Sequence, residues 1–226
     1  MKLEKAFWPI TRVANGMVAI QNALVQRMIL RTFERINIPA TRMGTYYGGW
    51  WIPNQVVQNG KSWFVISCGL GHDISFDQQM VKFGIPVLGI ESEEEFMSFL
   101  HGNGKIPQGM KVVHARVGLN SGGGLEIPDL MRFPATQNLD LKVVLKLDVE
   151  GSEFEVLKRV HHKDKMPEIL MFECDYLSLI PFLAFFQRFR KAYEVIKVLN
   201  RLSDYGYLLY KKENWNFHFV RMGVMT

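Results

Sequence analysis

The chain has 226 residues, of which 48% are hydrophobic, and this is enough to enclose one sizeable α/β core. Its net charge of +5 comes from 27 basic and 22 acidic residues that are interleaved, without a block of Lys and Arg or a zinc-finger or helix-turn-helix pattern. This distribution disfavours nucleic acid as a partner. We expect a single domain that covers residues 1–226.

Two cysteines, Cys68 and Cys174, are too few for a disulfide scaffold and lack CxxC spacing, which favours free thiols in a reducing compartment. No stretch reaches the roughly 18 apolar residues that a transmembrane segment needs. The N-terminal stretch also lacks the apolar core and small-residue cleavage site of a secretion signal. We therefore expect a cytoplasmic protein.

The N-terminal part predicts a long amphipathic helix. Residues 17–36 place apolar side chains at helical spacing with Arg and Gln between them, within a helical extension that we assign to residues 1–43. Such a helix covers a sheet, or mediates association with a partner or a second copy of the chain. Residues 46–54, "YYGGWWIPN", combine paired glycines, aromatic residues and a proline, which is typical of a loop or a short hairpin.

From residue 62 the chain alternates between strand and helix patterns, which predicts a mostly parallel sheet with right-handed crossovers. The expected strands are 63–69, 86–91, 111–118, 143–151 and 168–174, and the expected helices are 73–84, 92–101, 152–160 and 178–202. Residues 205–223 contain two strand runs around a short polar turn, so we expect an antiparallel hairpin to close the sheet. The predicted fold class is α/β, with a Rossmann-like, doubly wound, mostly parallel sheet of about seven strands.

The sequence "VISCGLGHDISFD" puts Gly69 and Gly71 at the end of the first central strand, just before a helix. Residues without Cβ let a ligand approach the backbone, and the following helix offers its positive N-terminal end. Glu91 ends the next strand, where a carboxylate can accept both hydroxyls of a ribose. The combination predicts a nucleoside-binding site.

The nucleoside can belong to NAD or to S-adenosylmethionine. A dinucleotide fingerprint needs a third small residue for close helix packing beside the pyrophosphate, and Ile74 stands at that position. Asp73 would repel a pyrophosphate but can attract the ammonium and sulfonium groups of S-adenosylmethionine. The terminal hairpin favours the same choice, because it resembles the last two strands of S-adenosylmethionine-dependent methyltransferases.

A second motif, "VVLKLDVEGSEFEVLK" at 143–158, sets an apolar strand directly before a group of acids. A strand that is buried on both faces ends at the edge where doubly wound sheets bind ligands, which places Asp148 at the mouth of the predicted site. Glu150 and Glu153 follow at the start of a helix. Acids at that position also stabilise the helix dipole, so a purely structural role stays open for both.

Three segments together resemble an FkbM-type, S-adenosylmethionine-dependent methyltransferase, in the branch with a GxGxDxSFD-like motif. They are "GGWW" at 48–51, "SCGLGHDISFD" at 67–77 and "LKLDVEGSEFEVLK" at 145–158. The resemblance spans roughly residues 44–175, and the two ends of the chain agree with it only in general architecture. The chain departs from the family after the second strand, where "IESEEE" replaces an Asp followed by Pro-Thr or a similar pair.

The resemblance implies the class I methyltransferase fold and O-methylation of a hydroxyl on a small molecule, a sugar or a lipid-linked acceptor. The residues that it implies for binding of S-adenosylmethionine are Gly49, Ser67, Gly69, Gly71, Asp73, Glu91 and Asp148.

Asp148, Glu173 and His72 are the candidates for orienting or deprotonating the acceptor. Asp148 and Glu173 end neighbouring predicted strands, an arrangement that suits Mg²⁺ or another divalent cation, and Asp175 is a third acid nearby. His114 is a further candidate base.

The aromatic residues before and within "GGWW" have two interpretations. Tyr46, Tyr47, Trp50 and Trp51 can form an aromatic wall over the cofactor or the acceptor, or they can simply pack the loop.

Two other functions stay open. One is a catalytically silent cofactor-binding module that uses the Met-containing N-terminal helix to bind a partner, although the acids at positions 148, 150 and 173 count against it. The other is a nicotinamide-dependent oxidoreductase, which Ile74 and the C-terminal hairpin disfavour.

Overall fold

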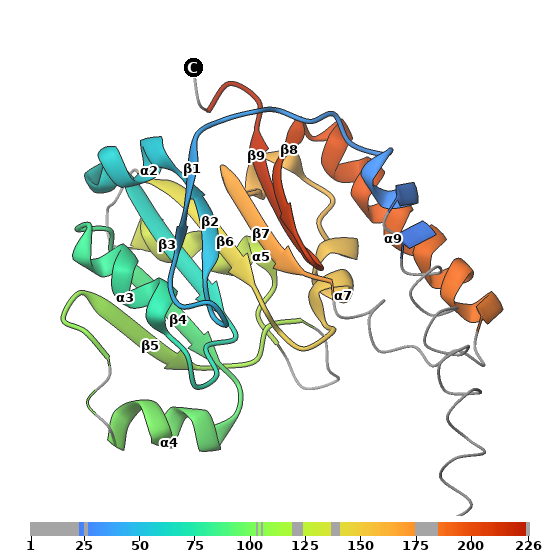
Figure 1. The fold of residues 1–226 in the computed structure, drawn as a ribbon. Helices are drawn as coiled ribbons and strands as arrows, with labels where there is room; N and C mark the ends of the chain where they lie inside the picture. The colour runs from blue at the N-terminus through green and yellow to red at the C-terminus, as the bar shows by residue number, and fades with distance from the viewer. Residues whose placement is uncertain are drawn as a thin grey trace, which may run out of the picture.

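The computed structural model describes residues 23–24, 27–102, 104, 106–118, 124–136, 141–174 and 185–224. Its centre is a seven-stranded sheet with the strand order β5-β4-β3-β6-β7-β9-β8 (Figure 1). The strands are β3 (Trp63–Cys68), β4 (Val87–Glu91), β5 (Met110–His114), β6 (Lys142–Leu147), β7 (Ile169–Glu173), β8 (Tyr207–Glu213) and β9 (Asn216–Arg221). The five strands from β5 to β7 in this order are parallel, and β9 runs antiparallel to both of its neighbours. The predicted Rossmann-like, doubly wound sheet with a C-terminal antiparallel hairpin is confirmed.

The strand order contains a switch point between β3 and β6. The chain moves outward from β3 through β4 to β5, and then returns to the other side of β3 to build β6 and β7. In open α/β sheets the connections diverge at such a point and leave a crevice outside the carboxyl ends of the strands. The turn after β3 and the acids after β6 both lie at this edge, as the sequence predicts.

The longer helices agree with the predicted ones. They are α3 (Ser75–Lys82), α4 (Glu94–Gly102), α7 (Glu153–Lys158) and α9 (Phe185–Asp204). Residues 178–184 of the predicted 178–202 helix lie outside the described residues. The sequence analysis did not predict the short helices α2 (Asn54–Gln58), α5 (Ile127–Leu130) and α6 (Arg132–Thr136), nor the single 3₁₀ turns at Gly60–Ser62 and Lys163–Lys165. No helix in the described parts of the chain is both long and apolar enough to cross a membrane.

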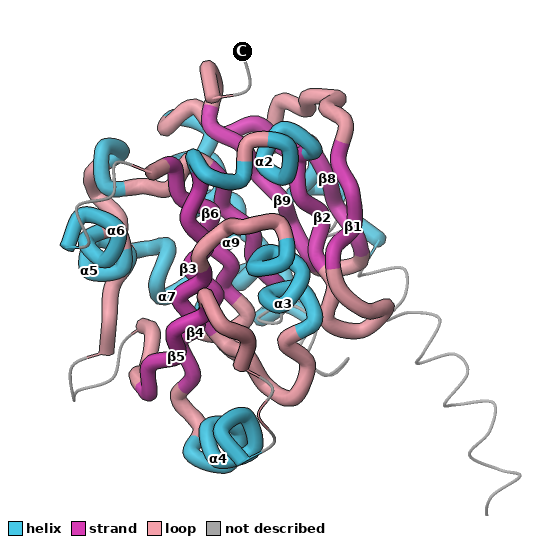
Figure 2. The backbone as a smooth tube through the Cα atoms, turned by 90° about the vertical axis from the view of Figure 1, so that its left-hand side faces the viewer, coloured by secondary structure: helices cyan, strands magenta, loops and turns pink. Residues whose placement is uncertain are grey.

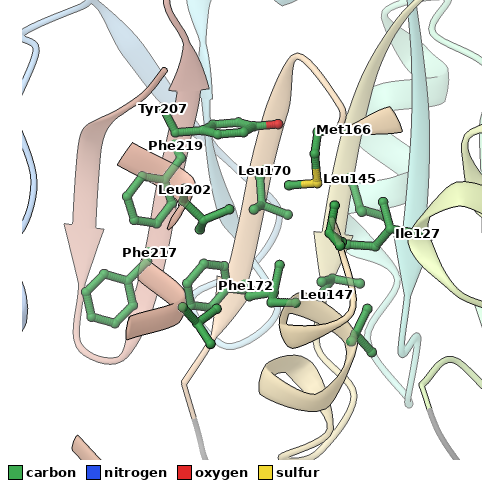
Figure 3. Close-up of a cluster of buried hydrophobic side chains, with 14 of the residues drawn as sticks. Ile127, Leu145, Leu147, Met166, Leu170, Phe172, Leu202, Tyr207, Phe217 and Phe219 are labelled. Carbon is green, nitrogen blue, oxygen red and sulfur yellow. The ribbon is translucent and has the colours of Figure 1, made fainter. Parts of the chain in front are cut away.

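Helices lie on both sides of the sheet (Figure 2), and buried side chains form a hydrophobic layer on each face. One face packs against α5, α7 and α9, and the other against α2, α3 and the hairpin of β1 (Ala40–Met43) and β2 (Trp50–Pro53). The first layer includes the stacked rings of Phe172 on β7 and of Phe217 and Phe219 on β9 (Figure 3). The ring centroid of Phe172 lies 5.7 Å from that of Phe217 and 5.7 Å from that of Phe219. Since successive side chains of a strand point to opposite faces, β6 contributes Leu145 and Leu147 to this layer and Val144 to the other.

The N-terminal helix ends earlier than predicted. Residues 27–30 are helical, but the chain then turns, and residues 34–36 run beside the outer edge of β8. Ile36 N donates to Leu209 O and Leu209 N donates to Glu34 O, each at 3.1 Å. The expectation of a helix to residue 36 is therefore wrong at its end, because the edge of the sheet offers these backbone groups other partners. Residues 17–22 and 25–26 of the predicted helix lie outside the described residues.

A short hairpin forms around residues 46–54, as one of the two predictions for this segment states. Its strands are β1 (Ala40–Met43) and β2 (Trp50–Pro53), and they pair antiparallel. Two hydrogen bonds join the hairpin to β9 and β8. Trp51 N donates to His218 Nε2 at 3.3 Å, and the Tyr210 hydroxyl donates to Trp51 O at 2.8 Å. Burial lowers the pKa of His218 to about 3, so its ring is neutral and can accept this bond.

Candidate functional site

A cavity of about 640 Å³ opens at the carboxyl edge of the sheet, at the switch point between β3 and β6. This volume is within the range of roughly 300 to 1,000 Å³ that is usual for sites that bind small molecules. Seven of the nine site residues predicted from the sequence line the cavity: Gly69, Gly71, His72, Asp73, Glu91, Asp148 and Glu173. Ser67 and Gly49 do not. The topology therefore brings together residues that are up to about a hundred positions apart in the chain.

The two glycines of the turn after β3 have different roles. Both have positive φ, 77° at Gly69 and 55° at Gly71. A Cβ at Gly69 would lie 1.6 Å from Asp148 O, so this residue is required for the close approach of the chain after β6. A Cβ at Gly71 would meet nothing within 4 Å. Gly69 thus meets a steric requirement within the protein and also lines the cavity, whereas Gly71 faces open space.

Glu91 fixes the backbone on two sides of the cavity. One carboxylate oxygen accepts the N–H groups of Leu70 (2.9 Å) and Gly71 (3.0 Å). The other accepts those of Ser92 (2.7 Å) and Glu93 (2.9 Å). The residue is only 4% exposed and still lines the cavity. Its carboxylate therefore joins the glycine turn to the loop after β4.

A buried lysine, which the sequence analysis did not single out, lies under the glycine turn. Lys146 is 4% exposed; its Nζ donates to Gly69 O at 2.7 Å and lies 3.3 Å from Asp148 Oδ2. Burial lowers the pKa of Lys146, but the charges of Asp148 and Asp77 outweigh this effect and leave the pKa above its usual value. A lysine inside the apolar run "VVLKL" was the available signal, because a strand buried on both faces leaves such a side chain no route to bulk water.

Asp77 and Ser67 lie beneath this lysine rather than in the cavity. Both are buried, and neither lines the cavity. Burial raises the pKa of the Asp77 carboxyl, and Lys146 opposes the shift. Ser67 lies beside the Asp77 carboxyl rather than in the cavity.

The acids after β6 divide into two groups. Asp148 and Glu150 line the cavity, while Glu153 is fully buried in the first turn of α7. One Glu153 oxygen accepts the N–H groups of Val149 (2.9 Å) and Gly151 (3.2 Å), and burial raises the pKa of this carboxyl to about 7. Glu153 therefore shapes the loop that presents Asp148 and Glu150.

The turn of the β1–β2 hairpin is hydrogen-bonded to residues that follow the glycine turn. The Thr45 hydroxyl donates to Asp73, and Ser75 N donates to the other oxygen of the same carboxylate at 2.9 Å. Partial burial raises the pKa of Asp73, but the hydrogen bonds outweigh burial and hold the pKa below its usual value. Gly49 packs inside this turn, because a Cβ there would lie 2.4 Å from Arg42 Nη1.

The two candidate histidines have different surroundings. His72 lines the cavity, with its ring edge-on to Phe96 and Phe99 at centroid distances of 4.6 and 4.7 Å. His114 lies outside the cavity lining, with Nε2 2.9 Å from Ser92 O.

Asp148 and Glu173 both line the cavity, as the metal hypothesis requires. Asp148 is paired with Lys146, and Asp175 lies outside the described residues. Across the ranges that the structure describes, no three His, Cys, Asp or Glu side chains form a group suited to a metal ion.

The cavity is acidic although the chain as a whole is basic. Seven carboxylates and three basic side chains line it. The acids are Asp73, Glu91, Glu93, Asp148, Glu150, Glu173 and Glu213, and the bases are Arg42, Arg116 and Lys146. This balance favours a ligand that carries positive charge.

No model of a protein family matches the chain, and no curated protein sequence matches it. Similar solved structures are known. A precorrin-6y C5,15-methyltransferase from Geobacter metallireducens has 12% identity and a TM-score of 0.43, covering 74% of this chain and 85% of its own. A fibrillarin pre-rRNA processing protein from Methanococcus jannaschii has 12% identity and a TM-score of 0.42, covering 72% and 67%. The fold assignment above rests on the order and directions of the strands.

Proposed function

We propose that the protein is an S-adenosylmethionine-dependent methyltransferase of the FkbM type that methylates a hydroxyl group of a small molecule, a sugar or a lipid-linked acceptor. The observation that carries the proposal is the acidic cavity at the switch point, bounded by the glycine turn and Glu91. S-adenosylmethionine has a sulfonium and an ammonium group against one carboxylate, so its net charge suits seven lining acids. A nicotinamide dinucleotide would instead place a doubly charged pyrophosphate beside Asp73.

The residues present fit this cofactor. Gly71 leaves open space beside the turn, and Glu91, whose two oxygens already accept four backbone N–H groups, holds the glycine turn and the loop after β4 in place at the cavity edge. Asp73 is ionised because hydrogen bonds lower its pKa, so it can attract an ammonium group. When bound, S-adenosylmethionine supplies a methyl group activated by a sulfonium.

The acceptor must be held in line with that methyl group and must lose a proton. In the transfer, the hydroxyl oxygen forms a bond to the methyl carbon, the carbon–sulfur bond breaks with its electron pair staying on sulfur, and the hydroxyl proton leaves to a base. Asp148 lines the cavity directly after β6, between the glycine turn after β3 and Glu173 at the end of β7. Its pairing with Lys146 fixes the carboxylate, so we assign it the orientation of the acceptor hydroxyl and receipt of its proton.

The cofactor is tested first by thermal unfolding with S-adenosylmethionine, S-adenosylhomocysteine and NAD. A ligand that binds only the folded state raises the apparent stability, so we expect the first two compounds, and not NAD, to raise the melting temperature. Stabilisation by NAD alone would overturn the proposal in favour of an oxidoreductase.

The chemistry is tested with Asp148→Asn, which preserves the size of the side chain. Methyl transfer to an acceptor found with labelled S-adenosylmethionine should fall by about 10²-fold or more, as is usual when acid–base catalysis is lost. Affinity for S-adenosylhomocysteine should change little. Loss of wild-type activity with EDTA and its return with Mg²⁺ would add a metal role for Asp148 and Glu173. Cofactor binding without transfer to any acceptor would instead favour the silent binding module.

A further inference from the structure

The cavity has a second end, which the cofactor motifs do not account for. Glu91 ends β4 and Glu173 ends β7, and these strands are separated by β3 and β6. Three strand spacings correspond to about 14 Å, so the two acids lie far apart along the cavity edge. On the side of the hairpin, β7 and β9, the lining residues that belong to none of the motifs are Arg42, Tyr46, Tyr47, Glu213, Asn214 and Asn216.

Two tyrosines stand at the mouth of this end on a fixed backbone. Arg42 donates to the carbonyls of Thr45 and Tyr46, the latter at 2.8 Å, and Thr45 N donates to Ser75 Oγ at 2.8 Å. The rings of Tyr46 and Tyr47 are nevertheless 96% and 92% exposed. Packing of the loop, one of the two interpretations of these residues, is therefore excluded for the tyrosine rings. A rigid turn that presents two bare aromatic rings beside a cavity is a surface suited to stacking on a ligand.

Polar groups line the cavity near this hairpin. Arg42 Nε donates to Glu213 Oε2 at 3.0 Å, which joins the hairpin to the end of β8 and brings its turn close to the β8–β9 turn. Asn214, in the left-handed conformation with φ 50°, and Asn216 continue the wall. The Asn216 Oδ1 atom is buried, whereas the side chain of Asn214 is exposed and can bond a ligand in the cavity.

We propose that this end of the cavity is the acceptor subsite and that it takes an uncharged sugar ring. The C–H face of the ring stacks on Tyr46 and Tyr47, and its hydroxyls bond the side chains of Asn214 and Glu213. Amide and carboxylate oxygens that accept from hydroxyls, opposite an aromatic surface, match the two kinds of surface that a sugar ring has. The proposal deepens the methyltransferase function above and rests on it.

The charges of the subsite argue against an anionic acceptor. Its two basic side chains, Arg42 and Lys146, lie 3.0 Å from Glu213 and 3.3 Å from Asp148. The cavity as a whole is lined by seven acidic side chains and by three from Lys and Arg. A phosphorylated or carboxylated sugar would therefore meet a net negative wall. A planar catechol can stack on the tyrosines, but its hydroxyls lie only in the plane of its ring. It therefore cannot stack on the rings and form hydrogen bonds with the wall as well as a sugar does.

The test measures binding before turnover. Methyl glycosides of gluco, galacto and manno configuration are titrated by saturation-transfer NMR onto the protein loaded with S-adenosylhomocysteine, together with the matching uronates and catechol. We expect saturable binding of at least one neutral glycoside, at least about tenfold tighter than its uronate or catechol. A dodecyl glycoside shows the source: tighter binding than the methyl glycoside indicates a lipid-linked acceptor, and equal binding a free sugar.

The double variant Tyr46→Ala/Tyr47→Ala tests the stacking surface, and both rings are exposed enough for the fold to tolerate it. Glycoside affinity should fall about tenfold or more, while affinity for S-adenosylhomocysteine, measured by calorimetry, should stay within about twofold. Tyr193→Ala is the matched control, because Tyr193 is an exposed tyrosine on α9 outside the cavity lining; it should change neither affinity.

Three results would overturn the sugar subsite while the methyltransferase proposal stands. They are no saturable glycoside binding by a protein that binds S-adenosylhomocysteine, preference for the uronate or catechol, and loss of S-adenosylhomocysteine affinity in the tyrosine variant without loss of glycoside affinity. Tyrosine-dependent glycoside binding by a protein that fails to bind S-adenosylhomocysteine would support the sugar subsite and remove the methyltransferase function.

Discussion

Replacing Glu91 by Gln tests the joint between the glycine turn and the loop after β4. In the wild type, two carboxylate oxygens accept four backbone N–H groups. The carboxamide has one oxygen, so the two N–H groups that face its NH₂ lose their acceptor. A buried donor without a partner costs about 1 to 3 kcal/mol, and water can reach some of these groups, so we expect a loss of about 2 to 4 kcal/mol. For a chain of this size, this lowers the melting temperature by about 5 to 15 °C.

The assay is urea unfolding followed by tryptophan fluorescence, combined with calorimetry of S-adenosylhomocysteine binding. Glu94→Gln is the control, because Glu94 is an exposed glutamate near the same loop that does not line the cavity. The Glu91 variant should also bind the ligand about 10 to 100-fold more weakly, which corresponds to 1 to 3 kcal/mol, since the turn that borders the site is no longer held. Equal unfolding midpoints for the two variants would refute the bonding argument. Unchanged ligand affinity would remove Glu91 from the site.

Three further substitutions separate structural roles from ligand roles. Gly69→Ala should lower the free energy of unfolding in urea by more than about 3 kcal/mol, because the new Cβ would overlap Asp148 O. Gly71→Ala should lower it by about 1 to 2 kcal/mol, because of the positive φ at this position. Gly71→Ala should also weaken binding of S-adenosylhomocysteine, as measured by calorimetry. A stable Gly69→Ala protein would contradict the steric argument. The buried Glu153 carboxyl has its pKa raised from 4.5 to about 7, so the folded state keeps a proton that the unfolded state releases, and stability should fall as pH rises through this window. Glu153→Gln should reduce this loss of stability and be more stable than the wild type above about pH 7, since one amide oxygen can still accept both loop N–H groups. If the pH profile of urea unfolding is unchanged in the variant, Glu153 is not the source of the pH dependence.

Local patterns account for most of the sheet. The runs around β3, β4, β6 and β7 are apolar and end at glycines or acids, so strand type, order along the chain and the position of the site at the carboxyl edge follow from the sequence. Asp148 and Glu91 could be placed in the site for this reason. The pairing of β9 between β7 and β8 agrees with the predicted terminal hairpin.

What escaped prediction depends on neighbours distant in the chain. Lys146 has its place because the carbonyl of Gly69 and the buried Asp77 lie beside it, and a single strand pattern shows neither. The steric role of Gly69 was missed for the same reason, because the atom that excludes a side chain there belongs to Asp148. The early end of the N-terminal helix depends on Leu209, which enters the sheet more than 170 residues later.

The short run of residues 34–36 beside β8 also affects how this protein meets other copies of itself in solution. An outermost strand with free backbone groups is a template on which another chain can add a strand, and this is a route to aggregation. Here the bonds with Leu209 occupy the middle of that edge, a bulge between Leu209 and Lys211 interrupts its regular spacing, and Lys211 and Lys212 add charge. These features disfavour the pairing of β8, the outermost strand on this side of the sheet, with a strand of another chain.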